Sequence, residues 1–224
     1  MDKRINKMIP LSFDLKTVGY GGYFILLAFA ATIIFHLMLM GGSATKYISL
    51  QTTVFIISVV GVLVWILPAY VEVVKPESKE LILSLPIDGL TFGFLRMVRL
   101  FALYTVFVLT LLFVVYVIGN ENRLEYGIVE VFLISGAVFF ISGLGMTVFL
   151  ISKNLVIGYG IPILWVSISF FYRGGASWLW HTCHWINPNP FESSLKYAVS
   201  HWITGMVLYI ISAFIIKQRE YLMG

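Results

Sequence analysis

The chain has 224 residues, of which 59% are hydrophobic and only 12% are charged. A soluble domain of this length could not bury so much apolar surface, so the composition predicts an integral membrane protein. The formal net charge of +4 is small and the basic residues are scattered, which gives no basis for nucleic-acid binding. The single cysteine excludes an internal disulfide.

Six apolar runs are long enough to cross the hydrocarbon core as helices, which takes about 20 residues each. Lipid cannot satisfy an open backbone, and the runs are too long and too uniformly apolar for barrel strands, so the expected fold is all-α. The second and fifth runs contain Pro68 and Pro162, which are expected to kink them. The runs lie at about 20–41, 53–74, 92–119, 127–152, 155–172 and 198–216.

Residues 3–18 mix basic and apolar side chains ahead of the first run. Such a segment can lie along a membrane surface with its cations toward anionic headgroups, so the sequence predicts an interfacial helix. A disordered basic tail is the alternative, because Pro10 interrupts any long helix. We do not expect a cleavable signal, since the first apolar run is too long for one and lacks a small-residue cleavage site.

The distribution of lysine and arginine predicts which side of the membrane each connection occupies. An even number of spans places both ends of the chain on one side, together with the 75–91 connector. We expect that side to be the cytoplasm and the membrane to be the plasma membrane, because eleven basic residues fall there and four on the other side. The eleven are Lys3, Arg4, Lys7, Lys16, Lys75, Lys79, Arg96, Arg99, Lys153, Lys217 and Arg219, and the four are Lys46, Arg123, Arg173 and Lys196.

The fourth run contains two groups of small residues about one heptad apart, 135–137 and 142–145. Small side chains let a second helix approach closely, so we expect these groups to serve packing rather than substrate binding. A tight polar turn, 152–154, separates the fourth run from the fifth and carries Lys153 at its tip.

The connector between the second and third spans, residues 76–88, is charged and prone to form a helix. Pro76 suits a first helical turn, acidic residues follow near the positive end of the helix dipole, and Pro86 ends the helix. The sequence therefore predicts a short cytoplasmic helix at about 76–86 with leucines along one face. That face is covered either by a partner's groove or by the ends of this chain's own spans.

The stretch from Glu80 to Ile87 reads ELILSLPI. It resembles the cytoplasmic coupling helix of type-2 permease subunits of ABC exporters, in which an acidic residue, two or three leucine-like residues, Ser or Thr, and Leu-Pro-Ile follow the second span. The layout of the whole chain is similar to that family, including a longer outside segment before the last span with the element Asn187 to Phe191. Many members have Gly-Thr where this chain has Glu77 and Ser78.

The resemblance implies that two copies of this chain pair with two copies of a cytoplasmic ATPase, which binds ATP and Mg and moves the coupling helices. The chain itself has no G-x-x-x-x-G-K-[ST] sequence, so we expect no catalytic residue and no cofactor in it. The mainly apolar spans favour a hydrophobic or amphipathic cargo, such as a peptide toxin or bacteriocin, a drug or a lipid. The residues implied to contact the ATPase are Glu77, Ser78, Lys79, Glu80, Leu81, Leu83 and Pro86.

Ionisable residues inside spans are candidates for a substrate pathway, because their burial in lipid is costly. His36 lies in the outer half of the first span and Glu130 near the outer end of the fourth. For His36 the alternative is a packed, hydrogen-bonded role. Arg96 and Arg99 begin the third span and are expected to snorkel to the cytoplasmic surface.

The outside segment, residues 173–197, is rich in tryptophan and histidine. Its apolar part is too short to span, so we expect a re-entrant or interfacial helix. His181 and His184, with Cys183 or His201, offer a loose metal or haem site without an evident carboxylate ligand. We expect no metal and an interfacial cap of hydrogen-bonded histidines. A histidine-rich redox or metal protein is the alternative function, and a non-catalytic immunity or scaffold protein is the third.

Overall fold

The computed structural model describes residues 58–75, 91–118, 128–171, 180–184 and 193–218, with a few scattered helical positions before residue 57. This part of the chain contains helices and turns but no strand, which confirms the all-α prediction for it. The helices are Ser58–Val74, which includes the 3-10 turn η1 (Leu67–Tyr70) and α3 (Val71–Val74), the π-helical turn η2 (Thr91–Leu95), α5 (Arg96–Ile118), α6 (Ile128–Ser152), α7 (Leu155–Phe171) and α8 (Ser194–Lys217).

Three helices in the described part are long and apolar enough to cross a membrane. They are Phe92–Thr110, Val131–Ser152 and Ser194–Lys217. Two further apolar helices, Ser58–Val74 and Leu155–Phe171, are shorter. Helix length and composition therefore agree with the membrane class that the sequence predicts. The count of six spans stays a prediction.

Several predicted segments lie outside the described residues. They are the interfacial helix at 3–18, the first span at 20–41 apart from scattered positions, the connector helix at 76–86, and most of the outside segment. The predicted spans that are described agree closely with the helices, and α6 and α7 begin and end within one residue of the expected positions.

The last span begins earlier than predicted, at Ser194 rather than at about residue 198. The apolar run alone marked residue 198 as its start. Tyr197 and Ala198 are buried against Leu133 of α6, so contact with a neighbouring helix stabilises the extra turn. The final residues of the predicted outside segment therefore belong to α8.

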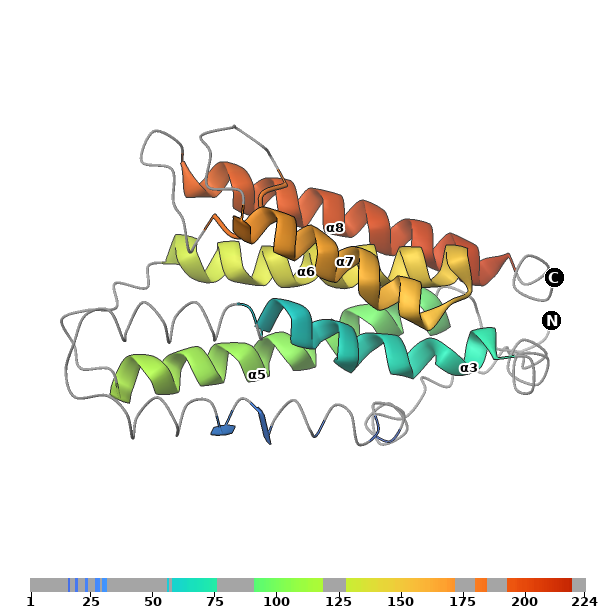
Figure 1. Ribbon diagram of the computed structural model, residues 1–224, viewed down its shortest axis with the longest axis horizontal. Helices are drawn as coiled ribbons and strands as arrows, with labels where there is room; N and C mark the ends of the chain where they lie inside the picture. Colours follow the sequence, from blue (N-terminus) through green and yellow to red (C-terminus); the bar gives the residue numbers. More distant parts are fainter. Residues whose placement is uncertain are drawn as a thin grey trace, which may run out of the picture.

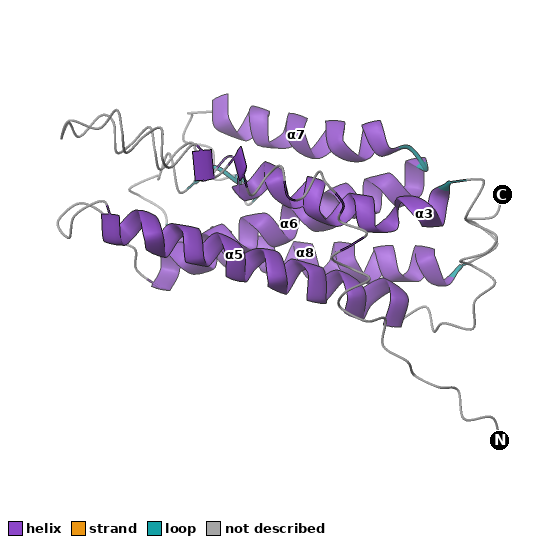
Figure 2. Ribbon diagram, turned by 90° about the horizontal axis from the view of Figure 1, so that it is seen from below, coloured by secondary structure: helices purple, strands orange, loops and turns teal. Residues whose placement is uncertain are grey.

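The helices lie side by side in one bundle with chain neighbours running in opposite directions (Figure 1). In the view from below, α7 lies on one side and α5 and α8 lie on the other, with α6 and α3 between them (Figure 2). One end of the bundle carries Lys75, η2, the turn between α6 and α7, and the last turn of α8. We call this the connector end, because the 76–90 connector joins the chain there.

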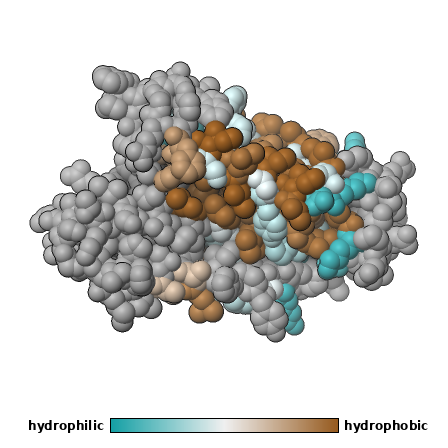
Figure 3. Space-filling view, in the orientation of Figure 1, coloured by the Kyte–Doolittle hydropathy of each residue, from teal (hydrophilic) through white to brown (hydrophobic). Residues whose placement is uncertain are grey.

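The centre of the bundle is α6. In an 18-residue apolar stretch of Val131–Ser152, 83% of the residues are buried, against 44% for such a stretch of Phe92–Thr110 and 33% for one of Ser194–Lys217. The other two helices therefore turn much of their surface outward. That outward surface is apolar over α7 and α8, and hydrophilic residues gather toward the connector end (Figure 3). An apolar belt bordered by polar residues fits a helix bundle surrounded by lipid.

Small residues let α6 and α8 approach closely, as predicted for the two groups in the fourth span. A Cβ atom on Gly143 would lie 3.0 Å from the Tyr209 ring, and one on Gly136 would lie 3.0 Å from the Trp202 ring. On α8, a Cβ atom on Gly205 would lie 2.6 Å from the Phe139 ring. The packing prediction is therefore confirmed for Gly136 and Gly143, because the facing rings occupy the space that larger side chains would need.

Hydrogen bonds join the same two helices in their buried interface. The Tyr209 hydroxyl lies 2.8 Å from the Ser142 hydroxyl. The Thr147 hydroxyl donates to the Leu208 carbonyl at 3.1 Å and lies 3.0 Å from the Ser212 hydroxyl. In an apolar interior few other donors or acceptors compete for these hydroxyl groups. The hydrogen bonds therefore fix the register of α8 on α6. We call these contacts, together with the glycine contacts, the α6–α8 seam.

The turn between α6 and α7 has the tight form that the sequence predicts. Lys153 has a positive φ of 52°, which reverses the chain within three residues. Asn154 then caps α7, because its side-chain oxygen accepts from the backbone N–H of Val156 at 2.9 Å. The helices consequently lie antiparallel and adjacent.

Candidate functional site

The predicted site residues fall mostly outside the described part of the chain. His36 and all seven predicted ATPase contacts, Glu77 to Pro86, lie there. The backbone of Glu130 lies in the first turn of α6, as expected for the end of the fourth span. What the structure describes is the place where the connector joins the bundle, between Lys75 and η2.

Pro68 determines the local form of the chain before the connector. A proline inside a helix removes a backbone donor and clashes with the preceding turn. Here the chain forms the 3-10 turn η1, in which the proline occupies one of the first two positions. The second span is therefore irregular at Pro68, where the sequence predicts a kink. Tyr70 closes η1, is fully buried, and lies across from η2.

Tyr70 ties the two sides of the connector together. Its hydroxyl donates a shared hydrogen bond to the backbone carbonyls of Phe92 at 3.0 Å and Gly93 at 3.1 Å. The Tyr70 and Phe92 rings also meet edge to face, with 5.8 Å between their centroids. A hydrogen bond between residues 22 apart in sequence therefore bridges the connector at its base.

Arg96 packs against both rings of this contact. Its guanidinium carbon lies 4.9 Å from the centre of the Tyr70 ring and 5.0 Å from that of Phe92, within the range of cation–π attraction. Arg96 is only 3% exposed, so the prediction that it snorkels to the surface is wrong. The reason is the pair of aromatic faces, which hold the flat guanidinium inside the bundle.

Gly93 joins the same cluster to α8. A Cβ atom on Gly93 would lie 3.2 Å from the Cα atom of Ala213, so the two backbones touch with almost no side chain between them. We define the connector base as Tyr70, Phe92, Gly93, Arg96 and Ala213. Through these residues Ser58–Val74, η2 and α8 meet at one point.

The connector base includes a turn of π-helical form, η2. A π turn is rare, leaves the usual i to i−4 pattern, and often marks a functional position in a helix. The carbonyls that accept from Tyr70 belong to this turn. The hydrogen-bond pattern of η2 therefore differs from that of α5, which continues as a regular α-helix.

At the opposite end of the bundle, the described part of the outside segment forms turns rather than the expected helix. Residues 180–184 are turn or irregular. Their polar atoms bond to α7 and α8 instead of to a helix of their own. The Trp180 carbonyl accepts from the Trp165 indole at 3.2 Å, and the Trp180 indole donates to the Thr204 hydroxyl at 3.0 Å. These bonds attach the segment to the bundle as a cap.

The histidines of this cap are buried and stacked on aromatic rings. His184 stacks on Tyr197 with 4.1 Å between centroids, and His201 stacks on Phe140 at 5.5 Å. His181 meets the edge of Tyr197 at 6.5 Å. Among the described residues, no group of three or more His, Cys, Asp or Glu could hold a metal ion. The packing of these rings is that of a cap.

Cys183 lies inside the cap and is fully buried. Its thiol donates a weak hydrogen bond to the Val166 carbonyl at 3.7 Å. Burial raises the pKa of Cys183 to about 11, against a smaller lowering effect of the Thr182 side chain. The sulfur therefore stays a protonated thiol near neutral pH, which makes it a poor nucleophile and a packing residue.

The sequence does not reveal the connector base. Tyr70 and Phe92 are ordinary aromatic residues of apolar runs, and nothing in their spacing shows that they meet. The available signals are Pro68, which marks the disturbance of the second span, and Gly93, which marks a close approach in the third. Arg96 is recognisable as a charge inside a span, but its aromatic partners depend on tertiary contact.

Comparisons with known proteins add no relative: no family model, no curated protein and no solved structure matches this chain.

Proposed function

We propose that this chain is the membrane permease subunit of an ATP-driven ABC exporter, and that residues 76–86 are its coupling helix. The observation that carries the proposal is the stretch Glu80 to Ile87, which resembles the coupling helix of that family. The apolar helical bundle supports it at a coarser level, because a permease must consist mainly of helices that cross the membrane.

The charges at the connector end support a cytoplasmic position for the connector. Lys75 follows α3, Lys153 lies in the turn between α6 and α7, and Lys217 ends α8. These three places lie at the same end of the bundle (Figure 1). Connections rich in lysine and arginine remain in the cytoplasm. In the proposed orientation the connector and both termini face a soluble ATPase, and the histidine cap faces outward.

The connector base supplies a route by which an ATPase moves the spans. Closure of the ATPase dimer on ATP and Mg displaces the coupling helix, whose contacts are Glu77, Ser78, Lys79, Glu80, Leu81, Leu83 and Pro86. The base links the two helices that flank the connector and touches α8. The proposed motion therefore shifts Ser58–Val74, η2 and α8 together, while the α6–α8 seam limits how far α8 can slide.

The cargo in this proposal is hydrophobic or amphipathic, such as a peptide toxin, a drug or a lipid. The support for this cargo class is the sequence, because the predicted spans are mainly apolar and carry few ionisable residues. Two copies of the chain assemble with two ATPases and form the passage between them. His36 and Glu130 are the candidates for contact with the cargo.

The proposal is tested by co-purification of tagged variants with the candidate ATPase after detergent solubilisation. The change Glu80→Arg combined with Leu81→Asp reverses a charge and removes an apolar contact on the predicted coupling helix. We expect the double variant to lose the ATPase while its melting temperature stays that of the wild type, because both positions are expected to lie in water.

The matched control is Glu72→Arg, which reverses a carboxylate at the same end of the bundle. Glu72 is partly exposed and pairs with Lys75 at 3.3 Å, outside the predicted coupling helix. This control should retain the ATPase at the wild-type ratio. Retention of the ATPase by the double variant would overturn the assignment of the coupling helix.

A further inference from the structure

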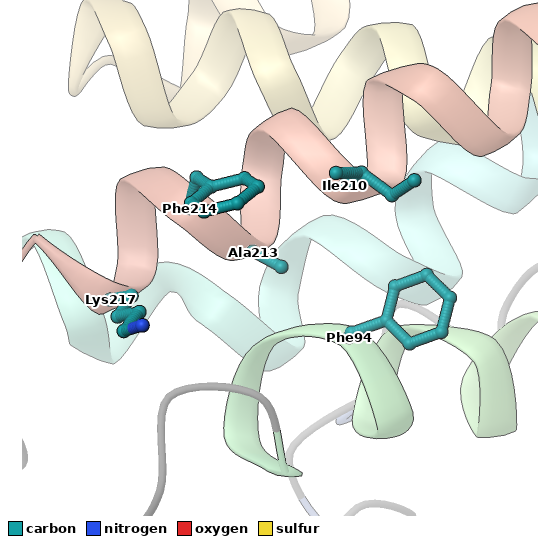
Figure 4. A pocket seen from close by; sticks show the side chains of 5 residues that line it. All are labelled: Phe94, Ile210, Ala213, Phe214 and Lys217. Atoms are coloured by element: carbon teal, nitrogen blue, oxygen red, sulfur yellow. The ribbon is translucent and has the colours of Figure 1, made fainter.

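An apolar cavity of about 230 Å³ lies at the connector end between η2 and α8 (Figure 4). Phe94 of η2 forms one wall, and the other lining residues are Ile210, Ala213, Phe214 and Lys217 of α8. The α8 residues occupy positions i, i+3, i+4 and i+7, so they form one stripe along a single face of the helix. Their stripe extends about 10 Å along the helix axis.

The cavity exists because small and large residues alternate where η2 meets α8. Gly93 and Ala213 let the two backbones touch. Beside this contact the bulky side chains of Phe94 and Phe214 hold the surfaces apart. Ile210 is 42% exposed and Phe214 is 59% exposed, so the cavity opens on the outer surface of the bundle, where lipid surrounds a membrane protein.

The charge at one end of the stripe determines which occupant fits. Lys217 is the last helical residue of α8 and is exposed. Among the described residues, no carboxylate forms an ion pair with Lys217, and Glu72 pairs with Lys75 instead. An occupant therefore meets apolar walls along most of its length and one ammonium group where the span ends.

We infer that this cavity binds one anionic phospholipid, with an acyl chain between Phe94 and the α8 stripe and the phosphate at Lys217. A basic residue at the end of an apolar groove between spans is the arrangement that recognises anionic headgroups. A polar cargo would leave its hydroxyl groups without partners on these walls. The inference requires only that the bundle spans a membrane, and it is independent of the proposed exporter function.

Native mass spectrometry of the purified chain tests the inference. The protein is exposed to an equimolar mixture of phosphatidylglycerol and phosphatidylcholine with identical acyl chains. We expect one phosphatidylglycerol to be retained in preference to phosphatidylcholine. Lys217→Gln should lower that preference roughly fivefold, because one cation near a membrane surface contributes on the order of 1 kcal/mol. Ile210→Trp should lower the retention of both lipids by filling the cavity.

Two control variants separate this site from general attraction to lipid. Lys153→Gln removes a charge at the same end of the bundle but outside the cavity, and Ile203→Trp adds the same bulk on the exposed face of α8. Both should leave lipid retention unchanged. Equal retention of the two lipids by the wild type, or an equal loss in Lys217→Gln and Lys153→Gln, would overturn the inference. A dimer that Ile210→Trp splits, with unchanged lipid retention, would assign the face to a second copy instead.

Discussion

The connector base and the α6–α8 seam are both buried contacts of α8, but they are built differently. In the seam, hydroxyl groups pair with one another and glycines lie against aromatic rings, as between Gly143 and Tyr209. At the connector base, a single hydroxyl, that of Tyr70, bonds to carbonyls of a π-helical turn. The seam extends along several turns of two long helices, whereas the connector base is one small cluster around Tyr70, where Gly93 also lies close to Ala213.

The difference indicates which contacts can rearrange. A close-packed interface of small residues and rings has one good arrangement, because any shift creates overlap or a void. A π turn departs from the usual i to i−4 pattern and often lies at a functional position, and here its carbonyls accept from the Tyr70 hydroxyl. We therefore expect the seam to determine stability and the connector base to determine how motion of the connector reaches the spans.

The largest effect is expected from a bulky residue in the seam. Gly143→Leu places a side chain where a Cβ atom alone would lie 3.0 Å from the Tyr209 ring and 3.1 Å from Leu208. Overpacking of this kind costs about 1–3 kcal/mol. We expect a clear loss of yield and a lower melting temperature in detergent.

Gly160→Leu is the matched control, because no atom lies within 4 Å of a Cβ placed there. It makes the same change in another membrane helix, α7, on an open side. Its melting temperature should stay close to that of the wild type. If Gly143→Leu were as stable as Gly160→Leu, the seam would not be the close contact described above.

An intermediate effect is expected from removing one hydroxyl in each region. Tyr70→Phe and Tyr209→Phe delete chemically identical groups, and each loss should cost about 1 kcal/mol of stability. Only Tyr70→Phe should lower the amount of cargo transported per ATP hydrolysed, measured in proteoliposomes with the ATPase. If the two variants transported equal amounts of cargo per ATP hydrolysed, the proposed difference between the connector base and the seam would be wrong.

The smallest effect is expected from the exposed ion pair at the connector end. Glu72→Gln breaks the contact between Glu72 and Lys75, whose side chains are 45% and 54% exposed. Such pairs contribute under about 1 kcal/mol and are screened by salt. The variant should retain the wild-type melting temperature within a degree or two and the wild-type coupling ratio. A large change in either quantity would show that this pair belongs to the connector base.

The sequence predicts helix positions well wherever apolar runs end at polar turns. The turn at 152–154 and the bounds of α6 and α7 follow from local chemistry alone. The start of α8 and the irregular form of residues 180–184 do not, because both depend on contacts with distant helices. Tyr197 extends α8 by packing against α6, and the Trp180 carbonyl accepts from the Trp165 indole of α7.

The candidate site was predictable only in part. The resemblance from Glu80 to Ile87 is visible in the sequence. The connector base could not be predicted, because its residues meet only through tertiary contacts. Arg96 is an example, since a basic side chain near the end of a span normally extends to the membrane surface. Here two aromatic rings, one from before the connector and one from after it, hold the guanidinium inside.

The most direct test of the exporter proposal is co-expression of the tagged chain with the ATPase encoded nearest to it, followed by size-exclusion chromatography in detergent. The expected result is one peak that hydrolyses ATP and contains equal numbers of the two chains, with a mass that fits two copies of each. A stable bundle that elutes without the ATPase, although both chains are present in the cell, would contradict the proposal.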